Sequence, residues 1–352
     1  MAIYAIWNNK GGVGKSYLTF QIASEYARQN PTRKTLVIDM CPQANSSSML
    51  LGGMINGENI LNQIHNIRPR ITISGYIEER IVSPYVNPQA GSRYITQVST
   101  HNPQVPNNLY LVIGDEQLEV QASRVRSATN PGPLDAWRVV HVWISDLIND
   151  IRTLWNNEDI SVFIDCNPSF SIYTELALTA ADRLLIPFSA DGSSKRAVKA
   201  VLSLVYGKVR HAGDMQSEFF INTSRYRMSQ PQIYMYIGNR LTQMNNSSAS
   251  AFKTVVNEIG DEIWDAYQAN PNQFCVHPNG APVPNNKRAF KSMFQYEVND
   301  ANTASVVSGA LGIPIVSLTA GQRNVAGRNI RVNQSQLDKQ IPNVEELVNN
   351  IE

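Results

Sequence analysis

Short apolar runs recur along the chain, and several of them lead into a polar residue. Four such runs span residues 3–7, 35–39, 161–165 and 232–237. Strands that are buried on both faces are apolar throughout, so these runs predict strands of a parallel sheet. Between the first two runs the apolar residues follow a helical spacing, at Leu18, Ile22, Ala23 and Tyr26. Strands that alternate with helices predict an α/β fold, a doubly wound and mostly parallel sheet flanked by helices.

A glycine-rich loop lies between the first predicted strand and the first predicted helix. Residues 9–16 read Asn-Lys-Gly-Gly-Val-Gly-Lys-Ser. The glycines allow backbone N–H groups to approach phosphate oxygens at the positive end of the helix dipole. In such a loop, Lys15 is expected to reach the β- and γ-phosphates, and the hydroxyl group of Ser16 is expected to bind Mg²⁺. The sequence therefore predicts a site for ATP and Mg²⁺.

The loop differs from the general pattern, because Asn9 stands where glycine is expected and a second lysine, Lys10, opens the loop. In these respects the string KGGVGKS resembles the deviant Walker A loop of the ParA/MinD family of P-loop ATPases. The resemblance implies that Lys10 crosses to the nucleotide of a partner subunit when two chains sandwich two ATP molecules. It also implies catalytic roles for Lys10 and Lys15, and a nucleotide site made of Lys10, Gly11, Gly12, Val13, Gly14, Lys15, Ser16 and Tyr17.

Cys41 stands where this family usually has a second aspartate. The preceding run ends in Asp39, and Pro42-Gln43 follows, as in the family. The missing carboxylate is the one that the family uses to position or activate the attacking water. A thiol accepts hydrogen bonds poorly, and at an ordinary pKa of about 8.5 it is mostly neutral. We therefore expect slow hydrolysis or a contribution from another group, while the resemblance implies a role for Asp39 in catalysis and in metal binding.

The run at residues 161–165 ends in Asp165 and continues as Cys166-Asn167-Pro168-Ser169. This segment is similar to the family's Walker B strand and switch, and Asp165 is expected to hold Mg²⁺ through a water molecule. The metal-binding residues expected in total are Ser16, Asp39 and Asp165. Asn239 follows the run at 232–237, and the resemblance implies that it contacts the adenine. The alternative, an asparagine that ends a strand and caps a turn, stays open.

The whole chain, residues 1–352, is expected to form a single P-loop ATPase domain. Two stretches, at about 52–133 and about 245–296, are longer than a minimal member of the family needs. We expect both to be lobes inserted into one core, because the motifs lie on either side of them. Their patterns indicate no function, although elaborations on a rigid scaffold often determine which partner is bound.

The chain contains 30 Lys and Arg against 29 Asp and Glu, so any contact with nucleic acid must come from local patches. One stretch, residues 193–211, contains no acidic residue. A basic run is often only a solvated face, but dimerisation would double the number of phosphate contacts that a weak patch makes. The DNA-binding candidates are Lys195, Arg196, Lys199, Arg323, Arg328 and Arg331; Lys208, Arg210 and His211 extend the first patch, and Lys287, Arg288 and Lys291 form another.

The resemblance implies a ParA-like ATPase that forms a homodimer on ATP binding and binds DNA nonspecifically. With a ParB-like or adaptor protein, it would segregate or position a plasmid, a chromosome or another cargo. The alternative is a nucleotide-gated scaffold or regulator that hydrolyses ATP slowly, which Cys41 favours. An electron-transfer ATPase related to the nitrogenase iron protein would need a pair of cysteines, and Cys41, Cys166 and Cys275 do not offer one.

Three widely spaced cysteines suit a reducing compartment, and the first residues do not resemble a signal peptide. The tail at residues 342–352 has an apolar stripe but is acidic, so anionic lipid would repel it. We expect it to be a helix packed on the core and not a membrane anchor. The expected location is the cytoplasm, with association to the nucleoid in the ATP-bound state.

Overall fold

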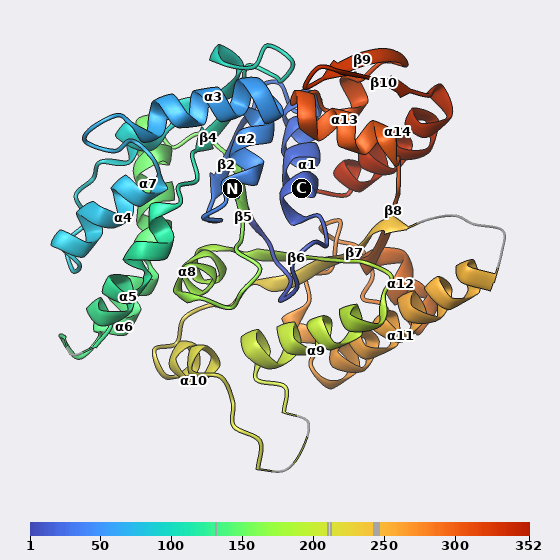
Figure 1. Ribbon diagram of the computed structural model, residues 1–352. Coiled ribbons are helices and arrows are strands. Elements are labelled where there is room, and N and C mark those ends of the chain that lie inside the picture. The colour runs from blue at the N-terminus through green and yellow to red at the C-terminus, as the bar shows by residue number, and fades with distance from the viewer. Residues whose placement is uncertain (131, 210, 212, 242–246) are drawn as a thin grey trace.

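The computed structural model describes residues 1–130, 132–209, 211, 213–241 and 247–352, and Figure 1 shows how its helices and strands are arranged. In that part of the chain the centre is an eight-stranded sheet with the order β3-β4-β2-β5-β1-β6-β7-β8. Neighbouring strands are parallel except β3, which runs antiparallel to β4 at one edge. The strands are β1 (Ala2–Ile6), β2 (Lys34–Asp39), β3 (Thr96–Gln97), β4 (Leu109–Val112), β5 (Ile160–Asp165), β6 (Arg183–Phe188), β7 (Gln232–Leu241) and β8 (Gln295–Asn299).

Helices cover both faces of this sheet and bury two apolar layers against it. On one face the layer is completed by α1, α2, α3 and α14, and on the other face by helices between α4 and α12. The predicted doubly wound, mostly parallel α/β fold is confirmed. The helices are α1 (Lys15–Gln29), α2 (Asn45–Leu50), α3 (Gly53–His65), α4 (Ile73–Val82), α5 (Gln117–Ala128), α6 (Ala136–His141), α7 (Trp143–Leu154), α8 (Ile172–Ala180), α9 (Gly192–Tyr206), α10 (Glu218–Arg225), α11 (Ser247–Ala269), α12 (Lys287–Phe294), α13 (Thr303–Leu311) and α14 (Gln334–Asn349).

The strand order places the carboxyl ends of β1, β5 and β2 side by side. In the register of the sheet, Ile6 pairs with Asp165, and Asp165 pairs with Asp39 on its other side. The carboxyl ends of parallel strands are where α/β proteins bind their ligands. The residues that follow these three strands therefore meet at one edge of the sheet.

The two long stretches noted in the sequence pack onto this same sheet. Residues 52–133 carry α3, α4 and α5 and also supply β3 and β4 to the sheet. Residues 245–296 carry α11, α12 and the first two residues of β8. Residues 131, 245 and 246 of these stretches lie outside the described residues.

The C-terminal part adds a small separate layer, seen in red in Figure 1. A two-stranded antiparallel hairpin, β9 (Gly321–Val325) and β10 (Arg328–Val332), packs with α13 and α14 around its own apolar cluster. Helix α14 also contacts α1 and buries Val344, Leu347 and Val348, so the predicted packing of the acidic tail on the core is confirmed. Among the described helices, none is long and apolar enough to cross a lipid bilayer.

Candidate nucleotide-binding site

The glycine-rich loop connects β1 to α1 and depends on glycine at two of its turns. Gly12 and Gly14 have φ angles of 75° and 82°, which favour glycine. At Gly14 a Cβ atom would lie 2.1 Å from Nδ2 of Asn239, so a side chain is excluded by space as well. The loop can therefore bring its backbone close to a ligand at the N-terminus of α1, the end of a helix that favours anions.

Lys15 begins α1, and its side chain lies buried against the loop. Its Nζ donates hydrogen bonds to the carbonyl oxygen of Lys10 at 2.7 Å and to that of Asn8 at 3.4 Å. Burial lowers the pKa of Lys15, and the charge of Asp165 opposes this effect. Within the described residues Lys15 makes no ion pair, so its charge is available to an anionic ligand at the loop.

Asp39 and Asp165 are both fully buried, but their surroundings differ. Asp39 accepts hydrogen bonds from the N–H group of Cys41 at 3.0 Å and from the N–H and Oγ of Ser47 at 3.0 and 2.7 Å. Neither carboxylate oxygen of Asp165 makes a close hydrogen bond among the described residues, although the hydroxyl groups of Ser16 and Ser46 lie near enough to lower its pKa. Burial raises the pKa of Asp39, and burial together with the neighbouring Asp39 raises the pKa of Asp165 to about 7.

The surroundings of Asp165 fit a bound Mg²⁺. A buried carboxylate without partners is costly unless a cation or an ordered water satisfies it. The hydroxyl group of Ser16 lies close enough to lower the pKa of Asp165. A hydroxyl and a carboxylate are hard oxygen donors, which Mg²⁺ uses together with phosphate oxygens and water. Asp39, in contrast, already holds the loop after β2 in place.

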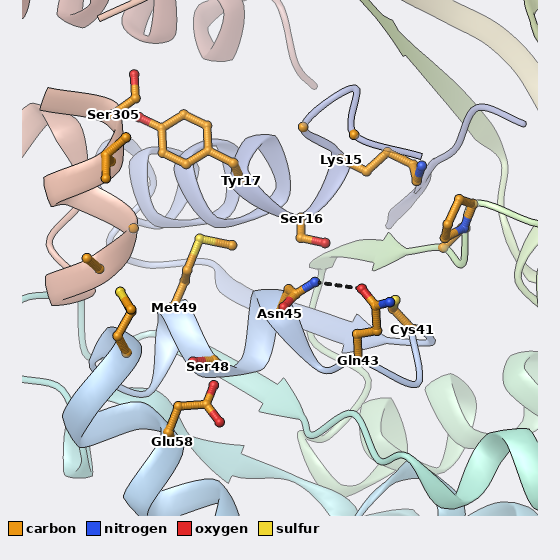
Figure 2. Close-up of a pocket in the computed structure, with 18 residues that line it drawn as sticks. Lys15, Ser16, Tyr17, Cys41, Gln43, Asn45, Ser48, Met49, Glu58 and Ser305 are labelled. Atoms are coloured by element: carbon orange, nitrogen blue, oxygen red, sulfur yellow. Dashed lines mark hydrogen bonds between the residues drawn. The ribbon is translucent and has the colours of Figure 1, made fainter. Parts of the chain in front are cut away.

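A cavity of about 480 Å³ opens beside the loop, and Figure 2 shows the side chains around it. The loop and the first residues of α1 form one wall, and the segments after β2 and β5 form a second. The third wall comes from α2, α3 and α13, which contribute Met49, Met54, Glu58, Ser305 and Val306. The cavity therefore combines a polar phosphate end with a more apolar far wall.

The far wall is held together by glycines at points of close contact. A Cβ atom on Gly57 of α3 would lie 2.1 Å from the carbonyl oxygen of Ser48 in α2. On Gly53 it would lie 2.2 Å from the carbonyl oxygen of Ala310 in α13. Only a hydrogen atom fits at these positions, so the backbones of the three helices are in direct contact there.

Cys41, which stands where the family usually has a second aspartate, lines this cavity. Its side chain is almost fully buried. Burial, together with the charges of Asp39 and Asp165, raises the pKa of Cys41 to about 12. The thiol is therefore neutral near pH 7 and is a poor base for an attacking water.

Lys10 is directed away from the cavity, toward the start of α9. Its Nζ donates to the carboxylate of Asp191, to Oγ of Ser189 at 3.0 Å and to Oγ of Ser194 at 3.2 Å. Asp191 is also the N-cap of α9, where it accepts from the N–H groups of Ser193 and Ser194. Burial alone would raise the pKa of Asp191, but the hydrogen bonds from Lys10 and its neighbours lower it.

Tyr17 and Asn239, both predicted to bind nucleotide, lie on different sides of the loop. Tyr17 lines the cavity, and its hydroxyl group donates to Oε1 of Gln340 at 3.0 Å. Asn239 is buried beneath the loop, where its Nδ2 donates to the carbonyl oxygen of Val13 at 2.9 Å and its Oδ1 has no partner among the described residues. Its predicted contact with adenine stays a prediction.

The predicted basic patch on α9 faces acidic residues of α11. Lys195 pairs with Glu258 at 3.0 Å, while Lys199 and Lys208 pair with Glu262 at 3.1 and 3.2 Å. In the patch formed by Lys287, Arg288 and Lys291, Lys287 of α12 pairs with Asp261, which is also on α11. Arg196 is exposed and makes no ion pair within the described residues, and Arg210 lies outside them.

The three predicted arginines at the C-terminal end lie on the β9–β10 hairpin. Arg323 is partly buried, and its Nη2 donates to the carbonyl oxygen of Thr319 at 3.0 Å and to Oγ1 of the same residue. Arg328 and Arg331 are exposed and have no ion pair in the described part of the chain. The basic patches therefore differ in how much of their charge is already neutralised.

Sequence reasoning missed the far wall of the cavity and the partner of Lys10. The spacing Gly52-Gly53 and Gly57 is a signal of close helix packing that could have indicated the wall. No local signal indicated Asp191, because it lies 181 residues from Lys10 in the sequence.

Comparisons with known proteins identify the family of the chain. The AAA_31 family, described as an AAA domain, matches residues 1–214. The chromosome partitioning protein ParA of Myxococcus xanthus is 29% identical over 189 residues, which are 54% of this chain and 52% of that protein. A putative replication protein A of Rhizobium rhizogenes is 28% identical over 230 residues, 64% of this chain and 49% of that protein. The chain thus spans about half the length of these relatives.

Among solved structures, the ATP complex of a McdA variant from Cyanothece has a similar fold. The TM-score is 0.60, with 14% identity, over 100% of this chain and 98% of that chain. At this level of identity the likeness concerns the fold.

Proposed function

The chain belongs to the AAA_31 family of P-loop ATPase domains and is homologous to ParA partition proteins, and from this premise we propose that it is an ATP-driven partition or positioning ATPase. In this proposal ATP binding joins two chains into a dimer, which binds DNA without sequence preference. A partner protein of the ParB or adaptor type then links the cycle to a plasmid, a chromosome or another cargo. No membrane takes part.

The observation that carries the proposal is the arrangement at the carboxyl ends of β1 and β5. Among the described residues, Lys15 is buried without an ion pair beside a glycine loop, and Asp165 is buried near the hydroxyl groups of Ser16 and Ser46 without a close hydrogen bond. Lys15 can therefore take an anionic ligand, and Asp165 can take a cation. A nucleotide phosphate with Mg²⁺ satisfies them together.

Within the proposal each residue has a defined task. The loop from Gly11 to Ser16 binds the phosphates, Lys15 contacts the β- and γ-phosphates, and Ser16 and Asp165 hold Mg²⁺. Asp39 fixes the loop after β2, which lines the γ-phosphate end of the cavity. Lys10 is the residue that crosses to the partner's nucleotide. We also propose that the chain is one domain, because both long stretches pack onto the same sheet.

Binding to random duplex DNA, measured with ATP, ADP or no nucleotide at two salt concentrations, tests this function. We expect binding that requires ATP, weakens steeply with salt and is absent in Lys15→Ala. Sedimentation of the same samples reports whether ATP produces the dimer. A wild-type protein that binds ATP and Mg²⁺ but ignores DNA in every state contradicts the partition function.

A second candidate function is a nucleotide-gated scaffold that hydrolyses ATP slowly. The specific observation in its favour is Cys41, a neutral thiol at the position where the family usually carries a carboxylate. The two candidates differ in phosphate release. Turnover that DNA and partner cannot accelerate supports the scaffold, whereas acceleration supports the cycling ATPase.

A further inference from the structure

The β9–β10 hairpin is a short, rigid ribbon with two different faces. Its two-residue turn has positive φ at both Ala326 and Gly327, 50° and 81°, the geometry that matches the twist of a hairpin. Oδ1 of Asn324 accepts from the N–H group of Gly327 at 3.0 Å and supports this turn. Val325 and Val332 are buried in the cluster that the hairpin shares with α13 and α14. One face of the ribbon is thus anchored.

The register of the hairpin assigns the opposite face to polar side chains. Arg331 pairs with Gln322, and Asn329 pairs with Asn324. These four residues, which we call the outer face, are all exposed. Side chains of this kind offer hydrogen-bond donors and acceptors without negative charge, as in surfaces that contact phosphate and sugar oxygens.

The hairpin carries positive charge, and within the described part of the chain none of its arginines forms an ion pair. The chain has no Asp or Glu between Asp300 and Asp338, and Arg323, Arg328 and Arg331 fall in this interval. The lysines of α9 lie in an acid-free interval too, but Glu258 and Glu262 of α11 pair with them across the α9–α11 contact. Of these two patches, the hairpin therefore has the greater free charge for an anionic partner.

One helix connects the hairpin to the nucleotide cavity. Ser305, Val306 and Gly309 of α13 line the cavity. Ala304 and Val307 of the same helix pack in the cluster that buries the inner side of the hairpin. A displacement of α13 at the cavity would therefore move the hairpin as well.

Arg328 pairs with the buried Val325 and so belongs to the row of the anchored face, but it lies at the end of the ribbon next to the turn and is exposed. We propose that the outer face of the β9–β10 hairpin, together with Arg328 at this exposed end, is the main surface that contacts duplex DNA, and that α13 makes this contact respond to the bound nucleotide. The lysines of α9 then serve chiefly to hold α11. The inference rests on the proposed function, since it specifies which surface carries the DNA contact.

The test compares two variants that each remove two positive charges. Arg328→Gln/Arg331→Gln changes the hairpin at exposed positions, and Lys195→Gln/Lys199→Gln changes α9. We expect the hairpin variant to bind random duplex DNA at least tenfold more weakly than wild type in the presence of ATP. The slope of log K against log salt should fall by about one for each phosphate that the variant no longer neutralises. The α9 variant should stay within about twofold of wild type.

Two further measurements keep the outcome specific. A fluorescent ATP analogue must bind the hairpin variant as tightly as wild type, which shows that its cavity is intact. Single-stranded DNA and an acidic peptide serve as competing ligands, and duplex DNA is expected to be preferred. If the hairpin variant binds duplex DNA like wild type, or the α9 variant no longer binds it, the inference is wrong while the partition function stands. A wild-type protein that binds no DNA overturns both.

Discussion

Lys10 and Asp191 form an ion pair that joins the phosphate-binding loop to the first turn of α9. The pair is partly exposed, so it contributes at most about 1 kcal/mol. In this arrangement the lysine lies within its own subunit. A contact with the nucleotide of a second subunit requires that Lys10 leave Asp191 first.

Removing the charge of Asp191 should therefore favour the proposed ATP-dependent dimer. Asp191→Asn keeps a residue that caps helices well, so α9 should remain intact while the ion pair is removed. We expect dimerisation with ATP to tighten by up to about fivefold, the equivalent of about 1 kcal/mol. Analytical ultracentrifugation over a dilution series measures this. Asp191→Ala removes the helix cap in addition to the ion pair, so this variant should also have a lower melting temperature. Equal dimer affinities in wild type and Asp191→Asn would contradict the role of the pair.

Cys41→Asp should raise ATP turnover. The substitution places a carboxylate where the thiol of Cys41 is neutral, and a positioned general base contributes about 10²–10⁴-fold in rate. We expect at least a tenfold increase in turnover when Mg²⁺ is present. Without Mg²⁺ the new carboxylate should destabilise the fold, because it lies near the negative charges of Asp39 and Asp165. Phosphate release in single-turnover and steady-state assays measures the effect. Cys41→Ser is the control and should leave turnover near that of wild type, whereas equal rates for the two variants would show that this position does not limit hydrolysis.

Gly57→Ala should loosen the far wall of the cavity. The added methyl group would lie 2.1 Å from the carbonyl oxygen of Ser48, so α2 and α3 must move apart. Overpacking of this kind costs about 1–3 kcal/mol, and we expect weaker nucleotide binding in addition. Urea unfolding and a nucleotide titration check both effects. Gly192→Ala is the matched control, because a Cβ atom there meets nothing within 4 Å, and that variant should be as stable as wild type or more stable.

The parts of the fold that the sequence predicts are those with local signals. The apolar runs around Val37 and Val162 indicate strands, because a strand that is buried on both faces has apolar side chains throughout. The loop at Gly14 is recognisable because its residues are consecutive in the sequence. The pairing of Glu262 with Lys199 and Lys208 could not be predicted, because it depends on how α11 packs across α9. A basic run in the sequence therefore looks the same whether its charge is free or neutralised, and only the tertiary contact distinguishes the two.

Asp115 should make the stability of the protein depend on pH. Its fully buried carboxylate pairs with Arg70 at 2.6 Å and accepts hydrogen bonds from Thr72 at 2.7 Å and from Ser74 at 2.6 Å. Burial alone would raise the pKa of Asp115, but these hydrogen bonds outweigh it and lower the pKa. A carboxyl group whose pKa is lower in the folded state stabilises the fold above the unfolded pKa, and this contribution disappears as the pH falls.

We therefore expect Asp115→Asn to lower the free energy of unfolding by about 3 kcal/mol at pH 7, as when one partner of a buried pair is removed. The difference between the variant and wild type should shrink as the pH falls below about 4, where this carboxyl group begins to take up a proton in the unfolded chain but stays charged in the folded one. Urea denaturation between about pH 3.5 and 7 measures this difference. Asp135→Asn is a suitable control, because Asp135 is only partly buried and its ion pair is with its neighbour Arg138. A difference for Asp115→Asn that stays constant across this range, or grows toward acid pH, would contradict a stabilising charged carboxylate at the end of β4.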